Sequence, residues 1–316
     1  GICLDSSSFN SLISNNASYN TNDGIYVFAS NNTTVSGGNA EYNYNGIYID
    51  SSSFSTLSGV ITSYNTENGV LIEKSTNITS DGGAMTFNFN GMRIDESVNS
   101  SINGVTASDN TENGIFVWGS NNTSVSGGKA ERNHYGIHFN LSSNNNVISS
   151  SAITVKSGDE GVRVFTSNFT SVIGNTFEIR PPGSIGVHII NSSFFDVSGN
   201  TFIGKGTQLL VNPSSNGLIT KNEFIESEMA VDVRDSLNLM FIGNIFKANE
   251  IAFRALSSVN VGLFDNVILN STFFDLVLED SEISLVNTSF DKEKIRVLGV
   301  SIFPISWSLN LVVVDE

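Results

Sequence analysis

The sequence predicts an all-β fold, a parallel β-helix (a solenoid) in which the chain winds into about 14 coils of 22–23 residues. A short frame of alternating apolar residues returns fourteen times, mostly at intervals of 22 or 23 residues, and a fixed period of this length indicates stacked structural units. Each interval also contains three short β-like runs separated by polar corners. No run of about ten residues has the 3.6-residue periodicity that a solenoid of helical hairpins would need.

The frame is clearest in YNYNGIYID, residues 42–50. In isolation, Asn45-Gly46 between β-formers would be a strong hairpin signal. A hairpin needs its partner strand directly after the turn, however, and has no reason to recur at a fixed interval. We therefore interpret each copy as a corner that leads into a strand. The copies begin at Gly1, Gly24, Gly46, Gly69, Gly91, Gly114, Gly136, Gly161, Gly186, Gln208, Ala230, Ala252, Asp275 and Lys294.

Each coil is predicted to hold three short strands. The first and third positions after the glycine are apolar, as in Ile47 and Ile49, which indicates a strand with one buried face. A second strand follows a turn rich in Ser and Asn, as in Thr34-Val35-Ser36. A third strand closes the coil in segments such as NTFEI and NTFIG, whose aromatic residues are expected to stack between coils. These residues are Phe177, Phe202, Phe224 and Phe246.

Two columns of asparagine support stacking in register. One column lies just before the glycine of the early coils, and the other occupies a different corner of the later coils. Stacked asparagines can hydrogen-bond their amides along the axis as ladders. The first column is Asn20, Asn43, Asn65, Asn88, Asn110 and Asn133, and the second is Asn175, Asn200, Asn222, Asn244 and Asn266.

Composition limits the classes of partner and compartment. The 316 residues carry a formal net charge of −16, which repels a phosphate backbone, so no nucleic acid is expected to bind. No apolar run reaches the roughly 18 residues of a transmembrane span. The one cysteine, Cys3, can form no disulfide within the chain, so the stacked core has to supply stability. Because the sequence opens inside a repeat, we expect a fragment or a processed chain.

Asparagine recurs in the pattern N-x-[ST], which marks glycan acceptors in chains exported past a glycosylation machinery. An Asn-, Ser- and Thr-rich sequence also creates this pattern by chance, and both origins stay open. Most copies fall between the first and second strands, so glycans would line one exterior edge, and the pattern favours an extracellular, cell-surface location. The candidate glycosylation sites are Asn16, Asn31, Asn32, Asn77, Asn99, Asn121, Asn122, Asn140, Asn168, Asn191, Asn270 and Asn287.

The pattern S-x-x-F-x-x-V-S-G-N-x-F…N-x-x-G-I-x-L resembles the right-handed parallel β-helix repeat of NosD-like periplasmic proteins. It is also similar to the carbohydrate-binding and sugar-hydrolase β-helix class, which includes pectate lyases and polygalacturonases, and to archaeal-type cell-surface β-helix proteins. The resemblance covers residues 1 to about 298 and implies a right-handed coil. It says little about activity, because the repeat residues serve the core and the corners.

The repeat predicts one elongated parallel β-helix domain over residues 1–298. The tail, residues 299–316, does not fit the coil. In it Trp307, Leu309, Leu311 and Val313 alternate as in a fresh strand. We expect the tail to be a C-terminal cap that covers the open strand edges, or the first strand of a following module that resembles an Ig-like domain.

Outward positions of the first strand are the candidates for chemistry. Asp50, Glu73 and Asp95 occupy one column in successive coils, with neighbours expected about 5 Å apart and the outer pair about 10 Å apart. These separations bracket the carboxylate spacings of glycosidases, and the same oxygens could hold Ca²⁺. The most economical interpretation is a solvated acidic face. No catalytic residue is therefore assigned, the three carboxylates remain candidates, and no cofactor other than Ca²⁺ is considered.

Aromatic and basic residues on the same face suit a glycan chain, since rings stack on pyranose faces. A basic trio in three consecutive coils lies beside two longer corners, VKSGDE and EIRPPGS, where an anionic sugar could dock. The alternative is a surface that uses these residues for β-propensity and cross-strand contacts. The candidate glycan-binding residues are Tyr26, Tyr48, Phe116, Trp118, His138, Arg163 and His188, of which the last three form the trio.

Together these patterns predict a structural or adhesive segment of an exported, N-glycosylated cell-surface protein, such as a filament, sheath or surface-layer component. Its partners would be copies of itself or other surface proteins, with polysaccharide as a further partner. The alternatives are a polysaccharide lyase or glycoside hydrolase, and a glycan-binding module, each using the first-strand face. The sequence contains no serine-nucleophile elbow, zinc spacing or phosphate loop.

Overall fold

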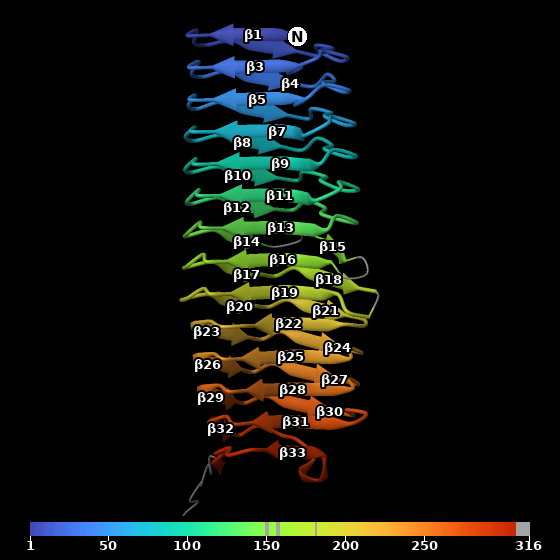
Figure 1. Ribbon diagram of the computed structural model, residues 1–316, viewed down its shortest axis with the longest axis vertical. Helices are drawn as coiled ribbons and strands as arrows, with labels where there is room; N and C mark the ends of the chain where they lie inside the picture. Colours follow the sequence, from blue (N-terminus) through green and yellow to red (C-terminus); the bar gives the residue numbers. More distant parts are fainter. Residues whose placement is uncertain (149–151, 156–158, 181, 308–316) are drawn as a thin grey trace, which may run out of the picture.

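The computed structural model describes residues 1–148, 152–155, 159–180 and 182–307. The chain forms a right-handed parallel β-helix, a rod in which successive coils lie on top of one another (Figure 1). Three parallel sheets, which we call A, B and C, run along the rod. The predicted fold class is confirmed.

Sheet A contains the strand that begins each frame, and its fourteen strands match the fourteen copies in the sequence. Neighbouring strands pair in the register of the repeat, as Ile47 does with Val70. The strands are β1 (Ile2–Asp5), β3 (Ile25–Phe28), β5 (Ile47–Asp50), β7 (Asn68–Glu73), β9 (Asn90–Asp95), β11 (Asn113–Trp118), β13 (Tyr135–Asn140), β16 (Glu160–Phe165), β19 (Ile185–Ile190), β22 (Thr207–Val211), β25 (Met229–Arg234), β28 (Ile251–Leu256), β31 (Phe274–Glu279) and β33 (Ile295–Leu298).

Sheet B contains the second strand of each coil and changes character along the rod. Its strands are three residues long up to β20 and six residues long in β23, β26 and β29. They are β2 (Ser11–Ile13), β4 (Thr34–Ser36), β6 (Thr56–Ser58), β8 (Thr79–Asp81), β10 (Ser101–Asn103), β12 (Ser124–Ser126), β14 (Asn146–Ile148), β17 (Ser171–Ile173), β20 (Asp196–Ser198), β23 (Ser215–Thr220), β26 (Leu237–Ile242), β29 (Val259–Phe264), β32 (Ile283–Val286) and β34 (Ile305–Ser306).

Sheet C corrects the prediction of a third strand in every coil. It has six strands among the described residues, namely β15 (Ala152–Val155), β18 (Thr176–Ile179), β21 (Thr201–Ile203), β24 (Glu223–Ile225), β27 (Ile245–Lys247) and β30 (Val267–Leu269). In earlier coils single bridge residues such as Asn39 and Ile61 take its place. There the chain turns too soon for a strand: Tyr42, three residues after Asn39, already has a φ of 56°, outside the extended region.

The predicted aromatic stack fills the core behind sheet C. Phe177, Phe202, Phe224 and Phe246 are fully buried. Successive ring centroids lie 4.7, 5.0 and 5.0 Å apart. The prediction of stacked rings inside the third strand is therefore confirmed.

Both asparagine columns form ladders, as predicted, and each amide serves mainly the backbone. The N–H of Asn43 donates to Oδ1 of Asn65 at 2.9 Å, and Nδ2 of Asn65 donates to the carbonyl oxygen of Ala40 at 3.1 Å. In the second column the N–H of Asn200 donates to Oδ1 of Asn222 at 2.9 Å. Buried corner groups of the backbone are thus satisfied without strand pairing.

A column of buried serines, which the sequence analysis did not single out, lies at the corner after sheet A. The N–H of Ser52 donates to Oγ of Ser75 at 3.1 Å, and Oγ of Ser75 donates to the carbonyl oxygen of Glu73 at 2.7 Å. The same pattern ties coil to coil along the rod through Ser30, Ser52, Ser75, Ser97, Ser120, Ser142, Ser167, Ser192, Ser214, Ser236, Ser258 and Ser281. The signal was present as a serine at the repeat spacing.

The C-terminal coil contains one 3-10 turn, η1 (Lys292–Lys294), before β33. After it, β34 pairs in parallel with β32, as Leu285 does with Ile305. Trp307 is exposed, and the remaining residues of the predicted tail strand, Leu309, Leu311 and Val313, lie outside the described residues. The domain division at residue 298 stays a prediction.

Candidate functional site

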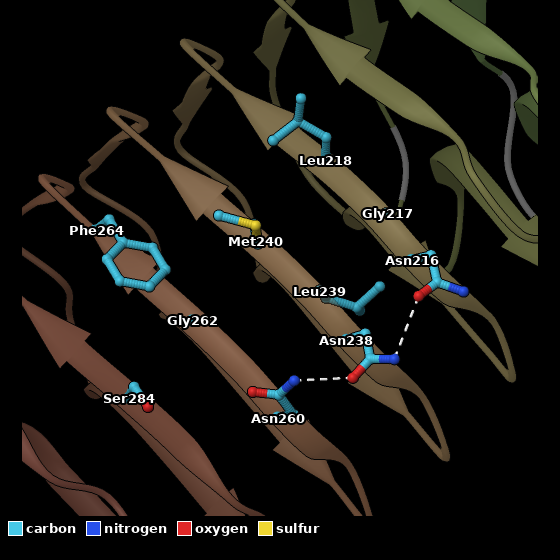
Figure 2. A pocket seen from close by; sticks show the side chains of 10 residues that line it. All are labelled: Asn216, Gly217, Leu218, Asn238, Leu239, Met240, Asn260, Gly262, Phe264 and Ser284. Carbon is cyan, nitrogen blue, oxygen red and sulfur yellow. Dashed lines mark hydrogen bonds between the residues drawn. The ribbon is translucent and has the colours of Figure 1, made fainter.

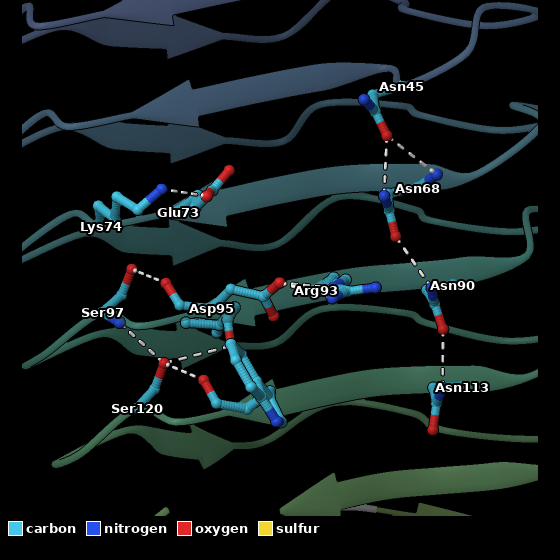
Figure 3. Close-up of polar contacts among 12 residues, drawn as sticks. Asn45, Asn68, Glu73, Lys74, Asn90, Arg93, Asp95, Ser97, Asn113 and Ser120 are labelled. Carbon is cyan, nitrogen blue, oxygen red and sulfur yellow. Dashed lines mark hydrogen bonds and ion pairs between the residues drawn. The ribbon is translucent and has the colours of Figure 1, made fainter. Parts of the chain in front are cut away.

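The three candidate carboxylates lie in one column of sheet A, on β5, β7 and β9. Their Cα register pairs Asp50 with Glu73 and Glu73 with Asp95. Basic side chains of the same chain already pair with two of them (Figure 3). Glu73 accepts a hydrogen bond from Nζ of Lys74 at 2.6 Å, and Asp95 accepts one from Nε of Arg93 at 2.7 Å. The column is real, but ion pairs engage two of its three carboxylates, so it is not an open pair of carboxylates.

Glu73 and Asp95 ionise in different environments. The hydrogen bond from Lys74 lowers the pKa of Glu73. Burial raises the pKa of Asp95, and the charge of Arg93 only partly opposes it. Asp95 is 8% exposed, so the expected solvated acidic face is wrong at this position. The side chain faces outward as predicted, but Arg93 and the neighbouring coils cover it.

The two candidate tyrosines use their hydroxyls within the same face. Tyr48 donates to Glu73, and Tyr26 lies 3.4 Å from Oδ2 of Asp50. Their ring centroids are 5.0 Å apart. Burial, followed by the charge of Asp50, raises the pKa of Tyr26 to about 12. Both tyrosines are half-buried, so their rings serve cross-strand contacts as well as the surface.

The basic trio lies in one column, as predicted, but it is not a free cationic patch. His138 pairs in register with Arg163, and Arg163 with His188. Glu160, which the sequence analysis overlooked, accepts at Oε1 from Nη1 of Arg163 at 3.3 Å and lies 2.9 Å from Nδ1 of His188. The carboxylate of Glu160, which is only partly exposed, therefore offsets the charge on which the expected anion site depended.

His138 itself is neutral near pH 7. Its ring lies between Phe116 and Tyr135, with centroid distances of 4.9 and 5.0 Å. Burial, with Arg163 and His134 adding to it, lowers the pKa of His138 to about 3. The two longer corners beside the trio include residues 156–158 and 181, which lie outside the described residues. A loop wall beside the trio therefore stays a prediction.

Phe116 and Trp118 complete the candidate face on β11. Trp118 follows Asp95 in its column, and the guanidinium of Arg93 lies 5.6 Å from the centre of the Phe116 ring. Both side chains are partly exposed. The face thus consists of residues that contact one another along the axis, and its role in glycan binding stays a proposal.

Most candidate glycosylation sites are accessible. Nine of the twelve asparagines are exposed, and Asn77, Asn140 and Asn287 are partly exposed. Nδ2 of Asn122 donates to Oδ1 of Asn99 at 3.2 Å, so these two acceptors are direct neighbours. Whether any of the twelve carries a glycan stays a prediction.

A row of exposed aromatic rings at the corner before sheet A escaped the sequence analysis. Tyr19, Tyr42, Tyr64 and Phe87 stack with centroid distances of 4.8, 5.2 and 4.9 Å and interplanar angles of 5°. Each inner ring is covered by its neighbours and shows mainly its edge to solvent. Their spacing, one residue before each asparagine of the first column, was a signal that could have identified them.

A hollow on the outer face of sheet B was also missed. It crosses β23, β26, β29 and β32 and has a volume of about 460 Å³ (Figure 2). Its apolar part includes Leu218, Met240 and Phe264, and its rim includes the amides of Asn216, Asn238 and Asn260. Leu218 and Met240, apolar residues on the outer side of the second strand, were the sequence signal that could have identified it.

The arrangement defines a class of protein: a parallel β-helix whose inner columns hold the coils together and whose outer columns form long faces. Within that class the sequence profile of the family described as "Periplasmic copper-binding protein (NosD)" matches residues 1–150 and 170–295. The chain therefore belongs to the NosD family. Membership of a periplasmic family fits an exported protein, in the periplasm or outside the cell. In the described part of the chain, no helix has the length and apolar character needed to cross a membrane.

Solved structures with the same fold have low sequence identity to this chain. PfbA, a surface adhesin of Streptococcus pneumoniae, is 11% identical over 85% of this chain and 84% of its own, with a TM-score of 0.56. DFA-IIIase from Arthrobacter chlorophenolicus A6, without its lid, is 10% identical over 84% and 88%, with a TM-score of 0.59. The Dettilon tailspike protein is 11% identical over 90% and 62%, with a TM-score of 0.54. These likenesses show the fold alone, and a search of curated proteins gave no match.

The copper in the family description does not fit the residues at hand. Among the described residues, no group of three or more His, Cys, Asp or Glu side chains is placed to hold a metal ion. His134 and His188 are engaged with Asp159 and Glu160, and Cys3 is exposed on β1. The same finding leaves the Ca²⁺ expectation for the carboxylate column without support, and no cofactor is assigned.

Proposed function

We propose that this chain is a rigid structural or adhesive segment of an exported, N-glycosylated cell-surface protein. The observation that carries the proposal is the continuity of the rod. Sheets A and B each contain fourteen strands in unbroken order, and the serine column links the coils through buried hydrogen bonds. Such a stack resists bending, because each coil is fixed on both sides by its neighbours. A stiff rod suits the presentation of a long face to partners.

The corner between sheets A and B supports the glycosylation part of the proposal. Asn32, Asn77, Asn99 and Asn122 occupy equivalent positions there with φ of 54–57°. The hydroxyl residue of each sequon then begins a strand of sheet B, as Thr34 does for Asn32. Glycans on this corner would form one line along the rod. Asn77, Asn99 and Asn122 lie on successive coils, about 5 Å apart, so we expect partial occupancy.

Lateral or glycan contacts are proposed for the outer face of sheet A. Rings and ion pairs alternate there, from Tyr26 and Tyr48 through Phe116 and Trp118 to His188. Copies of the chain, other surface proteins or a polysaccharide would contact this face. Because the side chains already support one another along the axis, little conformational entropy remains to be lost when a partner binds.

Catalysis by the carboxylate column is the competing proposal, and one observation favours it. The pKa of Asp95 is raised while that of Glu73 is lowered, as a glycosidase acid and its partner require. The partners Arg93 and Lys74 occupy these carboxylates, however, which counts against it. Release of reducing ends or unsaturated uronides that Asp95→Asn abolishes would establish catalysis and overturn the scaffold proposal.

The scaffold proposal is tested by electron microscopy of the native source material together with glycopeptide mass spectrometry. We expect ordered fibres or sheets, and glycans on peptides that contain Asn32, Asn99 or Asn122. Dispersed single particles with unmodified peptides at all twelve sequons would contradict the proposal.

A further inference from the structure

We propose that the hollow on the outer face of sheet B is a binding site for an uncharged oligosaccharide. This proposal rests on the adhesive part of the proposed function. It assigns a ligand class and a binding site to that adhesion. The site is separate from the first-strand face, because it lies on β23, β26, β29 and β32 near the C-terminal end of the described rod (Figures 1 and 2).

The hollow arises from a change of side-chain size down one outward column. The register places Leu218, Met240, Gly262 and Ser284 in line across the four strands. Leu218 and Met240 are 38% and 45% exposed and form an apolar wall. The next two positions carry no side chain and a small one, so the surface drops. A recess of about 460 Å³ is in the range that small ligands occupy.

Phe264 supplies a flat apolar floor in this recess. A Cβ added at Gly262 would lie 2.2 Å from Cε2 of Phe264, so the edge of the ring occupies the space that a side chain at Gly262 would take; Figure 2 shows both residues on β29. Some exposed rings elsewhere cover each other's faces, as Phe169 and Phe194 do at 5.0 Å. In the described part of the chain, no ring stacks on Phe264. Its face is therefore available to the C–H face of a sugar ring.

A row of amides borders the apolar floor. Nδ2 of Asn238 donates to Oδ1 of Asn216 at 3.2 Å, and Nδ2 of Asn260 donates to Oδ1 of Asn238 at 2.8 Å. A primary amide has two N–H donors and two acceptor sites, so Asn238 keeps one donor and one acceptor site beyond the row. All three asparagines are exposed. Because one asparagine stands in each coil, the row presents an amide donor and an amide acceptor to successive sugar hydroxyls.

The absence of charged residues in the recess favours an uncharged ligand. Every residue that lines the recess is uncharged, although the whole chain has a formal net charge of −16. A uronate or phosphate would approach a negative protein and find no cation in the recess to pair with. An apolar floor beside amide donors and acceptors fits a neutral saccharide, whose rings have apolar faces and a rim of hydroxyls.

The test measures binding of neutral gluco-, manno-, galacto- and fructo-oligosaccharides to the chain by isothermal titration calorimetry, with a uronate series alongside. Gly262→Ala displaces the Phe264 ring without removing it, and Phe264→Leu removes the flat face while keeping an apolar side chain. Asn238→Gly removes the middle amide at a position where φ is 55°, which glycine tolerates. Asn122→Gly is the matched control, because Asn122 belongs to an equivalent exposed amide pair far from the recess.

We expect at least one neutral oligosaccharide to bind, with affinity at least tenfold lower in Gly262→Ala and Phe264→Leu, several-fold lower in Asn238→Gly and unchanged in Asn122→Gly. The proposal is overturned if no neutral oligosaccharide binds, if binding survives all three changes, or if uronates bind better. It is also overturned if Gly262→Ala abolishes self-association of the chain in sedimentation but leaves oligosaccharide binding unchanged. The recess would then be a contact site for a second copy of the chain. None of these results depends on the microscopy or the glycopeptides, so the two proposals fail separately.

Discussion

The N-terminal coils, up to residue 148, and the C-terminal coils, from residue 159, share one repeat but are held together differently. In the N-terminal coils the corner before sheet A carries an asparagine ladder, and single bridges stand in place of a third strand. In the C-terminal coils, as far as β30, sheet C is present with a buried phenylalanine stack behind it. The outer face of sheet B also changes, from residues such as Thr34 and Ser36 to Leu218 and Met240.

The length of the repeat therefore does not dictate how a coil is stabilised. Polar ladders satisfy the backbone where the chain turns too sharply for a strand. In the later coils an asparagine ladder remains at another corner, and apolar burial is added where a third strand leaves room for large side chains. A change in one half should therefore act through a different mechanism from a change in the other.

The largest expected effect is in the phenylalanine stack. Phe202→Ala removes the second ring of a buried stack of four and should lower the free energy of unfolding by about 3–5 kcal/mol. Hydrogen exchange should rise most in β18, β21 and β24, since solenoid coils depend on their nearest neighbours. Phe169→Ala, in an exposed pair, is the control. An equal effect of both changes, or a uniform rise in exchange along the rod, would contradict the comparison.

The second prediction tests the junction of the two halves, where His138 lies. The pKa of His138 is about 3 in the folded state and about 6.5 in an unfolded chain. Between these values the unfolded state binds a proton that the folded state does not, so stability falls as pH drops through this window. At pH 4 the loss would be about 3 kcal/mol.

Urea unfolding at pH 7 and pH 4 measures this loss, with His138→Phe as the comparison because phenylalanine keeps the ring between Phe116 and Tyr135. The variant should lose less stability than the unchanged chain on acidification. Carboxylates titrate in both proteins, so their contribution cancels in the difference. The same pH dependence in both proteins would show that His138 is not held neutral.

The third prediction concerns the N-terminal ladder. Asn65→Ala removes the acceptor of the Asn43 N–H and the donor to the Ala40 carbonyl oxygen, both in a buried corner. Unsatisfied buried groups should destabilise the chain by roughly 1–3 kcal/mol. The exposed neighbour change Thr66→Ala serves as the control in denaturant unfolding. A loss below that of Thr66→Ala would mean that the ladder does not stabilise the early coils.

The smallest expected effect is in the exposed aromatic row. Tyr64→Asn removes the ring that stacks between Tyr42 and Phe87, and asparagine tolerates the φ of 57° at this position. Stacked pairs contribute about 0.5–1.5 kcal/mol beyond their buried area, so the unfolding midpoint should fall only slightly. A loss as large as that of Phe202→Ala would show that the exposed row is part of the main stabilising core.

Much of the fold could be predicted because it depends on period and alternation. The frames that begin at Gly46 and Gly69 form adjacent strands in the expected register, and the asparagine columns form the predicted ladders. The prediction of a third strand was wrong for the early coils, because a pattern of apolar residues does not reveal the positive φ at Tyr42. The candidate site was predicted as columns, but its partners, such as Glu160 beside Arg163, come from other positions of the coil.

The period of the sequence specifies which residues form a column, because a repeat of constant length places equivalent positions one above another. What each column does depends on how the coil folds. Burial and close neighbours turn Asp95 into an ion-pair partner, keep His138 neutral and lay the Phe264 ring over Gly262. These outcomes depend on distances between different columns around one coil, and a one-dimensional period contains no information about those distances.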